Sequence, residues 1–210
     1  MKRLLTLLLA ILSILTFSCK KTSNETTSTA TPDYYQLKVG NYWIYQNYTI
    51  DTNGVVTAGK LFDSAHIEKD TIIRGYTYYK LWENELLLNP TQTPIYQRDS
   101  SGFLVSNLGC KVCSDNDFKD TLEIDTNNLN IFKGYVKMTG KDSVVTVPAG
   151  SFQSITCRMR VVPTQPNDPH PVRYIYDVYG KNIGRIKSHN FYYIGGQQIE
   201  IRLVRYKVNN

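Results

Sequence analysis

The chain has 210 residues, a net charge of +6 and 41% hydrophobic residues, a composition typical of a globular protein rather than of a disordered or fibrous one. Its basic residues are scattered and form no stripe, so no binding to nucleic acid is expected. The longest apolar run, residues 4–17, covers about 14 residues and falls short of the roughly 20 that a membrane-spanning helix needs.

The first residues have the layout of an export signal. Lys2 and Arg3 precede the apolar run, and Ser18-Cys19 closes it. This layout resembles the signal of bacterial lipoproteins, in which the cysteine is lipidated and becomes the new N-terminus. Residues 1–18 are therefore predicted to be a signal peptide and Cys19 the lipid attachment site. The alternative is an ordinary signal peptide with an incidental cysteine at its end.

Residues 19–33 are predicted to tether the lipid to the folded domain. The segment after Cys19 is rich in Ser and Thr and lacks large apolar side chains, so it cannot bury enough surface to become ordered. Lys20 directly follows the cysteine. Lipoproteins that are retained in the inner membrane have Asp at this position. The resemblance therefore implies attachment to the outer membrane. A periplasm-facing position is preferred, with surface exposure as the alternative.

Residues 34–210 show period-two alternation and turn signals throughout, which indicates a single all-β domain. About ten to twelve strands are expected, mostly joined by short turns. In chain order they are residues 41–50, 65–73, 76–83, 95–98, 103–107, 132–138, 143–147, 153–162, 173–179 and 185–188, followed by a hairpin of 191–194 with 197–208.

Such a succession predicts an antiparallel meander that curls, because a single sheet of this size does not stay open and flat. The expected fold is a curved half-barrel or a lipocalin-like barrel, with a two-sheet β-sandwich as the alternative. Residues 139–142 are expected to form a turn between two strands. Residues 117–130 contain the best helical spacing in the domain, so at most one short helix is expected there.

Three stretches resemble a group of uncharacterised envelope lipoproteins of Gram-negative bacteria. They are residues 35–45, which contain Gly40-Asn41-Tyr42-Trp43, then Val147-Pro148-Ala149-Gly150-Ser151-Phe152, and then residues 176–187. The resemblance implies a curved antiparallel sheet distantly similar to periplasmic lipoprotein carriers. It supplies no catalytic residues.

Physical reasoning gives these stretches structural roles. Gly150 can take a positive φ and close a turn, and Gly180 and Gly184 suit a tight turn or a bulge. Trp43 and Tyr45 lie on the same face of one expected strand. That face is expected to be core rather than a platform for a ligand.

The cysteines of the domain allow several interpretations. Cys110 and Cys113 are expected to form a disulfide in an oxidising compartment. A thioredoxin-like redox pair, a zinc site and free thiols are the alternatives. Cys157 alternates with Ile155 and Met159 on one strand face and is expected to be a small buried side chain.

No residues with the spacing of a catalytic or metal site are found, and no cofactor is expected. The acidic stretch of residues 115–125 lacks the glycine and final glutamate of a calcium loop. His66, His170 and His189 form no metal-binding pair. Glu83 and Glu85 lack a catalytic spacing, although two carboxylates of a glycosidase need only converge in space.

The sequence therefore predicts a non-enzymatic envelope lipoprotein, bound to the membrane by its lipid. Its curved sheet is expected to bind an apolar or amphiphilic ligand. The alternative is an interaction or structural protein that contacts an envelope protein or a glycan through exposed tyrosines, which are abundant. A hydrolase is the third hypothesis. An apolar cavity, a filled core or convergent polar groups inside the sheet would separate the three.

Overall fold

A computed structural model describes residues 32–84, 93–126, 131–165, 168–191 and 196–209 of the chain. These residues contain twelve strands and no helix. In the described ranges, therefore, nothing has the helical length and apolar character needed to cross a bilayer. The strands are β1 (Tyr42–Ile50), β2 (Val56–Ile73), β3 (Tyr76–Asn84), β4 (Ile95–Ser100), β5 (Phe103–Ser106), β6 (Lys111–Ser114), β7 (Thr121–Thr126), β8 (Phe132–Val147), β9 (Gly150–Pro163), β10 (Arg173–Gly180), β11 (Gly184–Phe191) and β12 (Gln198–Lys207).

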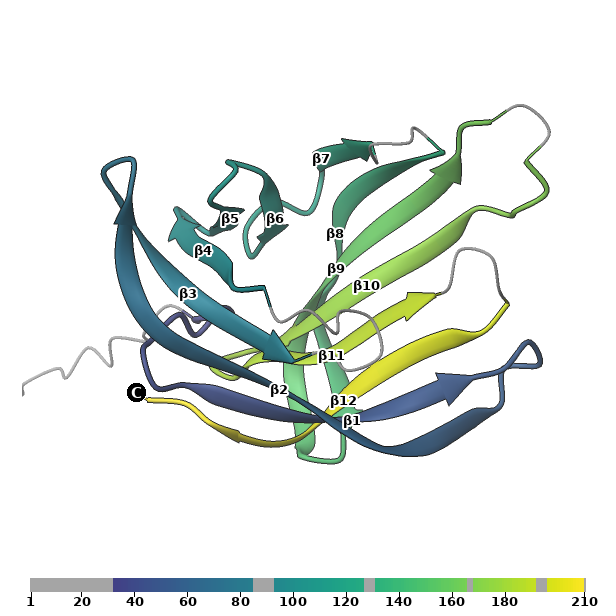
Figure 1. Ribbon diagram of the computed structural model, residues 1–210, viewed down its shortest axis with the longest axis horizontal. Coiled ribbons are helices and arrows are strands. Elements are labelled where there is room, and N and C mark those ends of the chain that lie inside the picture. The colour runs from purple at the N-terminus through teal and green to yellow at the C-terminus, as the bar shows by residue number, and fades with distance from the viewer. Residues whose placement is uncertain (1–31, 85–92, 127–130, 166–167, 192–195, 210) are drawn as a thin grey trace, which may run out of the picture. The chain divides into compact units, whose positions relative to one another are not determined.

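The strands form one antiparallel sheet in which sequence neighbours pair, so the order along the sheet is β6-β5-β4-β3-β2-β1-β12-β11-β10-β9-β8-β7. Pairing of β1 with β12 joins the two halves of the chain. The sheet curls until its two end strands, β6 and β7, lie close without pairing, and this leaves one unsealed seam (Figure 1). The barrel expected from the sequence is confirmed, and the alternative of a sandwich is wrong.

The turn expected at residues 139–142 is wrong, because β8 continues through it. These residues form a bulge instead: the register with β9 shifts between Thr139 and Ser143, and Gly140 and Asp142 take φ values of 61° and 57°. The long hairpin of β8 and β9 explains this outcome. Pairing on both sides of the bulge holds the strand together, and the extra residues increase its local bend.

The helix considered for residues 117–130 is also absent from the part of that range that the structure describes. The Asp117 carboxylate accepts hydrogen bonds from the backbone N–H groups of Lys119 and Asp120, both at 3.1 Å. These bonds hold the pKa of Asp117 below its ordinary value. A side chain that closes a local turn in this way competes with helix formation, and Thr121–Thr126 then forms β7.

One end of the barrel departs from regular pairing. The pairing of β11 with β12 begins at Lys187, so the start of β11 has no partner strand on that side. Two side chains of β1 replace it: Trp43 Nε1–H donates to Ile183 O at 2.6 Å, and Tyr45 O–H donates to Arg185 O at 2.9 Å. Buried carbonyls need such partners, so β1 fixes the path of the β10–β11 turn.

The tip of the β8–β9 hairpin covers this same end. Ala149 N–H donates to Leu203 O of β12 at 2.9 Å, and Lys181 N–H donates to Gln153 O at 2.8 Å. The Phe152 ring contacts Tyr206 edge-on, with centroids 6.0 Å apart. The three stretches that carry the sequence resemblance therefore meet at one place in the fold.

The core consists of two clusters of buried side chains. One includes two tyrosines of the segment before β1 and consists of Tyr34, Tyr35, Leu104, Cys113, Leu122, Val136, Met138, Ile155, Cys157 and Tyr179. The other lies around the β1–β12 pairing and contains Trp43, Tyr45, Ala65, Ile67, Leu81, Val147, Val178, Ile186, Ile201 and Leu203. Trp43 and Tyr45 are 4% and 2% exposed, so both side chains are buried.

Replacement of Gly184 by alanine tests the junction at Trp43. Gly184 has a φ of +96°, and a Cβ there would lie 2.9 Å from Trp43 Cζ2. Gly75 is the matched control, because its φ is +82° but nothing lies within 4 Å of its Cβ position. We expect Gly184→Ala to lower the free energy of unfolding in urea by about 1–3 kcal/mol more than Gly75→Ala does. Equal losses would mean that Trp43 does not constrain this turn.

Candidate functional site

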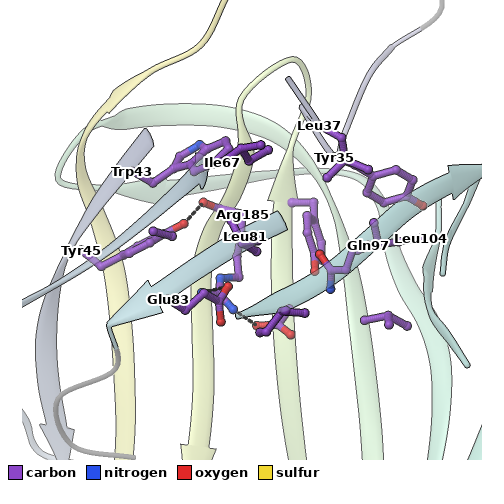
Figure 2. Close-up of a pocket in the computed structure, with 15 residues that line it drawn as sticks. Tyr35, Leu37, Trp43, Tyr45, Ile67, Leu81, Glu83, Gln97, Leu104 and Arg185 are labelled. Atoms are coloured by element: carbon purple, nitrogen blue, oxygen red, sulfur yellow. Dashed lines mark hydrogen bonds and ion pairs between the residues drawn. The ribbon is translucent and has the colours of Figure 1, made fainter. Parts of the chain in front are cut away.

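A cavity of about 220 Å³ lies inside the barrel. Its wall combines apolar and polar side chains. Among the apolar ones, Trp43 from β1, Ile67 from β2, Leu81 from β3 and Leu104 from β5 face it (Figure 2). Side chains from strands far apart in the sequence reach it because period-two alternation directs one face of every strand inward. The interior is therefore not completely filled by side chains.

Three charged side chains also line this cavity. Arg185 Nη2 lies 2.8 Å from Glu83 Oε1, and Arg185 Nη1 lies 3.9 Å from Asp177 Oδ1. Arg185 and Glu83 are 15% and 14% exposed. Asp177 Oδ1 is buried and has no hydrogen-bond partner among the described residues, since 3.9 Å is too long for one. Two carboxylates and one guanidinium give the group a net charge of −1, with one oxygen open to a donor.

Tyrosines surround this charged group. Burial raises the pKa of Tyr45 and that of Tyr179, and it also raises the pKa of Tyr35 at the far wall. The nearby Arg185 partly opposes the shift at Tyr45. All three phenols therefore stay neutral near pH 7 and add no charge. The Arg185 guanidinium lies 5.5 Å from the centroid of the Tyr45 ring, which adds a cation–π contact.

A second cavity, of about 410 Å³, lies beside the seam. It shares Val112 and Asp177 with the first cavity, so the two are neighbours inside the barrel. Val136, Met159 and Ile175 are among the apolar side chains that line it. The seam itself is crossed by a side chain rather than by paired strands: Glu123 Oε2 of β7 accepts a hydrogen bond from the backbone N–H of Lys111 in β6 at 3.2 Å.

The structure holds Cys110, Cys113 and Cys157 as free thiols. Cys110 is exposed, whereas Cys113 is fully buried, so the two side chains lie in different environments. The disulfide expected between them stays a prediction. Cys157 is 8% exposed, which confirms its expected burial. Cys19, the predicted lipid attachment site, lies outside the described residues.

A separate charged cluster lies on the outward-facing side of β10, β11 and β12. Glu200 is 2% exposed, and its carboxylate contacts Lys187 Nζ at 2.8 Å and Arg202 Nε at 2.5 Å. Tyr176 O–H donates to Glu200 Oε2 at 2.9 Å, and the Tyr176 ring stacks on His189. Burial opposes the ionisation of Glu200, but these contacts outweigh it and lower its pKa. This cluster stabilises the sheet and does not line the first cavity.

The histidines and the other carboxylates considered from the sequence do not come together in one site within the described residues. Within the described ranges, no group of three or more His, Cys, Asp and Glu side chains is placed to hold a metal ion. His170 pairs locally with Asp168, at 2.6 Å, and His189 bonds to Gln198, at 2.7 Å. Glu85 lies outside the described residues.

Sequence reasoning did not identify Arg185 and Asp177 as residues of the cavity. Both lie in the third stretch of the resemblance, where the sequence analysis expected two strands and a turn but assigned no role in a site. A usable signal was present: Asp177 alternates with Ile175 and Tyr179, so an acidic residue occupies an inward position of a strand. A charged side chain on an otherwise apolar strand face is the pattern to search for.

Comparison with known proteins gives a likeness of structure alone. No protein-family model and no curated protein matches the chain. The chain is similar to a solved structure from Bacteroides fragilis, of a protein assigned as exported and with a YmcC-like fold: identity is 13%, coverage is 84% of this chain and 100% of that one, and the TM-score is 0.51. A Parabacteroides distasonis protein assigned as a lipoprotein gives 12% identity, 84% and 99% coverage and a TM-score of 0.44. At this identity, the first likeness establishes a shared fold.

The outer cluster makes stability depend on pH. The pKa of Glu200 is lower in the folded protein than its ordinary value of 4.5, so its ionic contacts stabilise the fold at neutral pH. That contribution is lost as the pH falls below about 4.5. We expect Glu200→Gln to lower the free energy of unfolding at pH 7 by about 1–3 kcal/mol. The free energy of unfolding of this variant should also decline less steeply towards acid pH than that of the wild type.

Glu68→Gln is the control for this prediction. Glu68 also pairs with a lysine, Lys80, at 2.7 Å, but its side chain is 39% exposed. Solvent and salt screen such a pair, so this variant should stay close to the wild type. Identical pH profiles for Glu200→Gln and the wild type, measured by urea unfolding, would contradict the role given to Glu200.

Proposed function

We propose that the chain is a lipid-anchored protein of the cell envelope whose barrel binds a small amphiphilic ligand and catalyses no reaction. The observation that carries the proposal is the group of Arg185, Glu83 and Asp177 inside a cavity whose wall also has apolar side chains. An apolar pocket with a few convergent polar groups is the usual form of a small-molecule site.

The location rests on the sequence and on the comparison. Cys19 closes a segment with the layout of a lipoprotein signal, and the structural neighbour from Bacteroides fragilis is assigned as exported. Lipid attachment at Cys19 would hold the barrel near a membrane, the source of amphiphilic molecules. We place the anchor in the outer membrane with the barrel on the periplasmic side, because Lys20 follows the cysteine.

The chemistry of the cavity favours a particular ligand. The apolar wall formed by residues such as Ile67 and Leu81 suits a short alkyl or aromatic body. The charged group is net negative and contains the open acceptor Asp177 Oδ1. A head group that donates hydrogen bonds, above all an ammonium, would complete it. A carboxylate head would be repelled by Glu83 and Asp177.

The alternative, an interaction protein with tyrosine-rich faces, has weaker support. Among the described residues, only two tyrosines, Tyr76 and Tyr174, are strongly exposed, at 57% and 42%. Tyr34, Tyr35, Tyr45, Tyr78 and Tyr179 are buried. Seven further tyrosines of the described ranges are half-buried, so few of them present the exposed ring that a binding surface needs.

A cavity-filling variant tests the proposal. Ala65 lies on β2 at the wall of the first cavity, and Ala58 lies on the same strand but is exposed. We expect full-length protein to retain a ligand from envelope lipid extract in native mass spectrometry. Ala65→Leu should reduce the retained fraction about tenfold, because its added volume occupies the cavity, while Ala58→Leu should leave it unchanged. Equal retention by both variants would place the ligand elsewhere, and no retention by the wild type would contradict the proposal.

Head-group preference is tested with hexylammonium, hexanol and hexanoate, which share one alkyl chain and differ in charge. The net negative group predicts the strongest binding for hexylammonium and the weakest for hexanoate, with a difference of about tenfold or more. In Asp177→Asn this preference should shrink, since one carboxylate charge is removed. A preference for hexanoate in the wild type would contradict the assigned polarity.

A further inference from the structure

We infer that Cys113 and Cys157 are a cross-linking site, at which a disulfide ties strand β6 to strand β9 across the unsealed seam of the barrel. The pair differs from the Cys110–Cys113 disulfide expected from sequence spacing. The inference is independent of ligand binding. It draws on the proposed export only for the oxidising surroundings in which such a bond persists.

Three observations place the two thiols near each other. Cys157 S–H donates to Val112 O at 3.0 Å, and Val112 directly precedes Cys113. Cys113 S–H donates to Met138 Sδ at 3.7 Å, and Met138 is the cross-strand partner of Cys157 in the β8–β9 ladder. Burial raises the pKa of the Cys113 thiol, and the neighbouring Cys157 thiol adds to that rise. Cross-strand partners have Cβ atoms roughly 5 Å apart, so the residue that Cys113 contacts lies beside Cys157.

Cys110 is placed much less well to bond with Cys113. Lys111–Ser114 forms β6, with an irregular register against β5 between Lys111 and Cys113. At roughly 3.3 Å per residue, an extended chain would place the two Cα atoms up to about 10 Å apart, whereas a disulfide needs Cα atoms within about 7 Å. Cys110 also faces solvent while Cys113 is fully buried. Their bond would require the backbone of β6 to move.

The chemistry requires an oxidant, for which a low-molecular-weight or protein disulfide suffices. Cys157 lines the cavity beside the seam and, at 8% exposed, is the less buried thiol of the pair, whereas Cys113 is fully buried and burial raises the pKa of its thiol. The Cys157 thiolate attacks one sulfur of the oxidant and displaces a thiol, which leaves a mixed disulfide. The Cys113 thiolate then attacks the Cys157 sulfur and displaces the second thiol. The two cysteines are oxidised, the oxidant is reduced to two thiols, and those thiols carry the two protons.

The position of this bond gives it a structural consequence. β6 is an end strand that pairs only with β5 among the described strands. Side chains link its backbone to the other side of the seam: Lys111 N–H donates to Glu123, Ser114 N–H donates to Met138, and Val112 O accepts from Cys157. Val112 of β6 lines both interior cavities. A covalent bond from Cys113 to β9 would fix the wall of both cavities and keep the seam from opening.

Peptide mapping of the full chain tests the inference. The protein is treated with oxidised glutathione, its remaining thiols are blocked with N-ethylmaleimide, and it is digested without reduction. We expect a linked peptide that joins Cys113 to Cys157, with Cys110 alkylated. Cys110→Ser should form the same link in the same yield. Cys157→Ser should form none that involves residue 157, and reduction should lower the melting temperature of the wild type and of Cys110→Ser.

Two results would overturn the inference. One is a linked peptide that joins Cys110 to Cys113, and the other is alkylation of all three cysteines after oxidation. Because the mapping of the wild type and of Cys110→Ser decides the question, a folding defect in Cys157→Ser leaves the test intact. Loss of ligand retention would affect the proposed function alone, because the mapping needs no ligand.

Discussion

Buried backbone carbonyls need hydrogen-bond partners, and at one end of this barrel side chains supply them where strand pairing stops. β11 pairs with β12 only from Lys187 onward, so the turn before it is held by the indole of Trp43 and the hydroxyl of Tyr45. With this turn in place, the β8–β9 tip can bond to Leu203 and cover the same end. The path of several strands therefore depends on two aromatic donors of β1.

The same contacts create the polar part of the cavity. Tyr45 holds the backbone of Arg185, and the Arg185 side chain then reaches Glu83 and approaches Asp177. A buried ion pair seldom adds to stability, because the loss of hydration opposes the attraction between the charges. The presence of this ion pair in the cavity wall is explained if the charged group also binds a ligand. The seam is the other irregular feature, and three sulfur atoms gather beside it.

Much of the fold could be predicted from the sequence because period-two alternation is a local property. Nearly every expected strand exists, and Trp43, Tyr45 and Cys157 are buried as their alternation indicates. The errors have physical causes. Residues 139–142 have the composition of a turn, but pairing with β9 on both sides keeps them within β8. The helical spacing after Asp117 gives way to a turn closed by the Asp117 carboxylate.

The sequence by itself determined the all-β class and the inward faces of the strands, and it predicts the export signal and the lipid attachment at Cys19, because each depends on residues close together in the chain. Only the tertiary structure decided which inward side chains meet. Glu83 and Arg185 are far apart in the sequence, and so are Val112 and Cys157, and their contacts follow from how the sheet closes. Closure depends on the pairing of β1 with β12 and on the position of the seam. These are long-range relations that alternation along one strand does not encode.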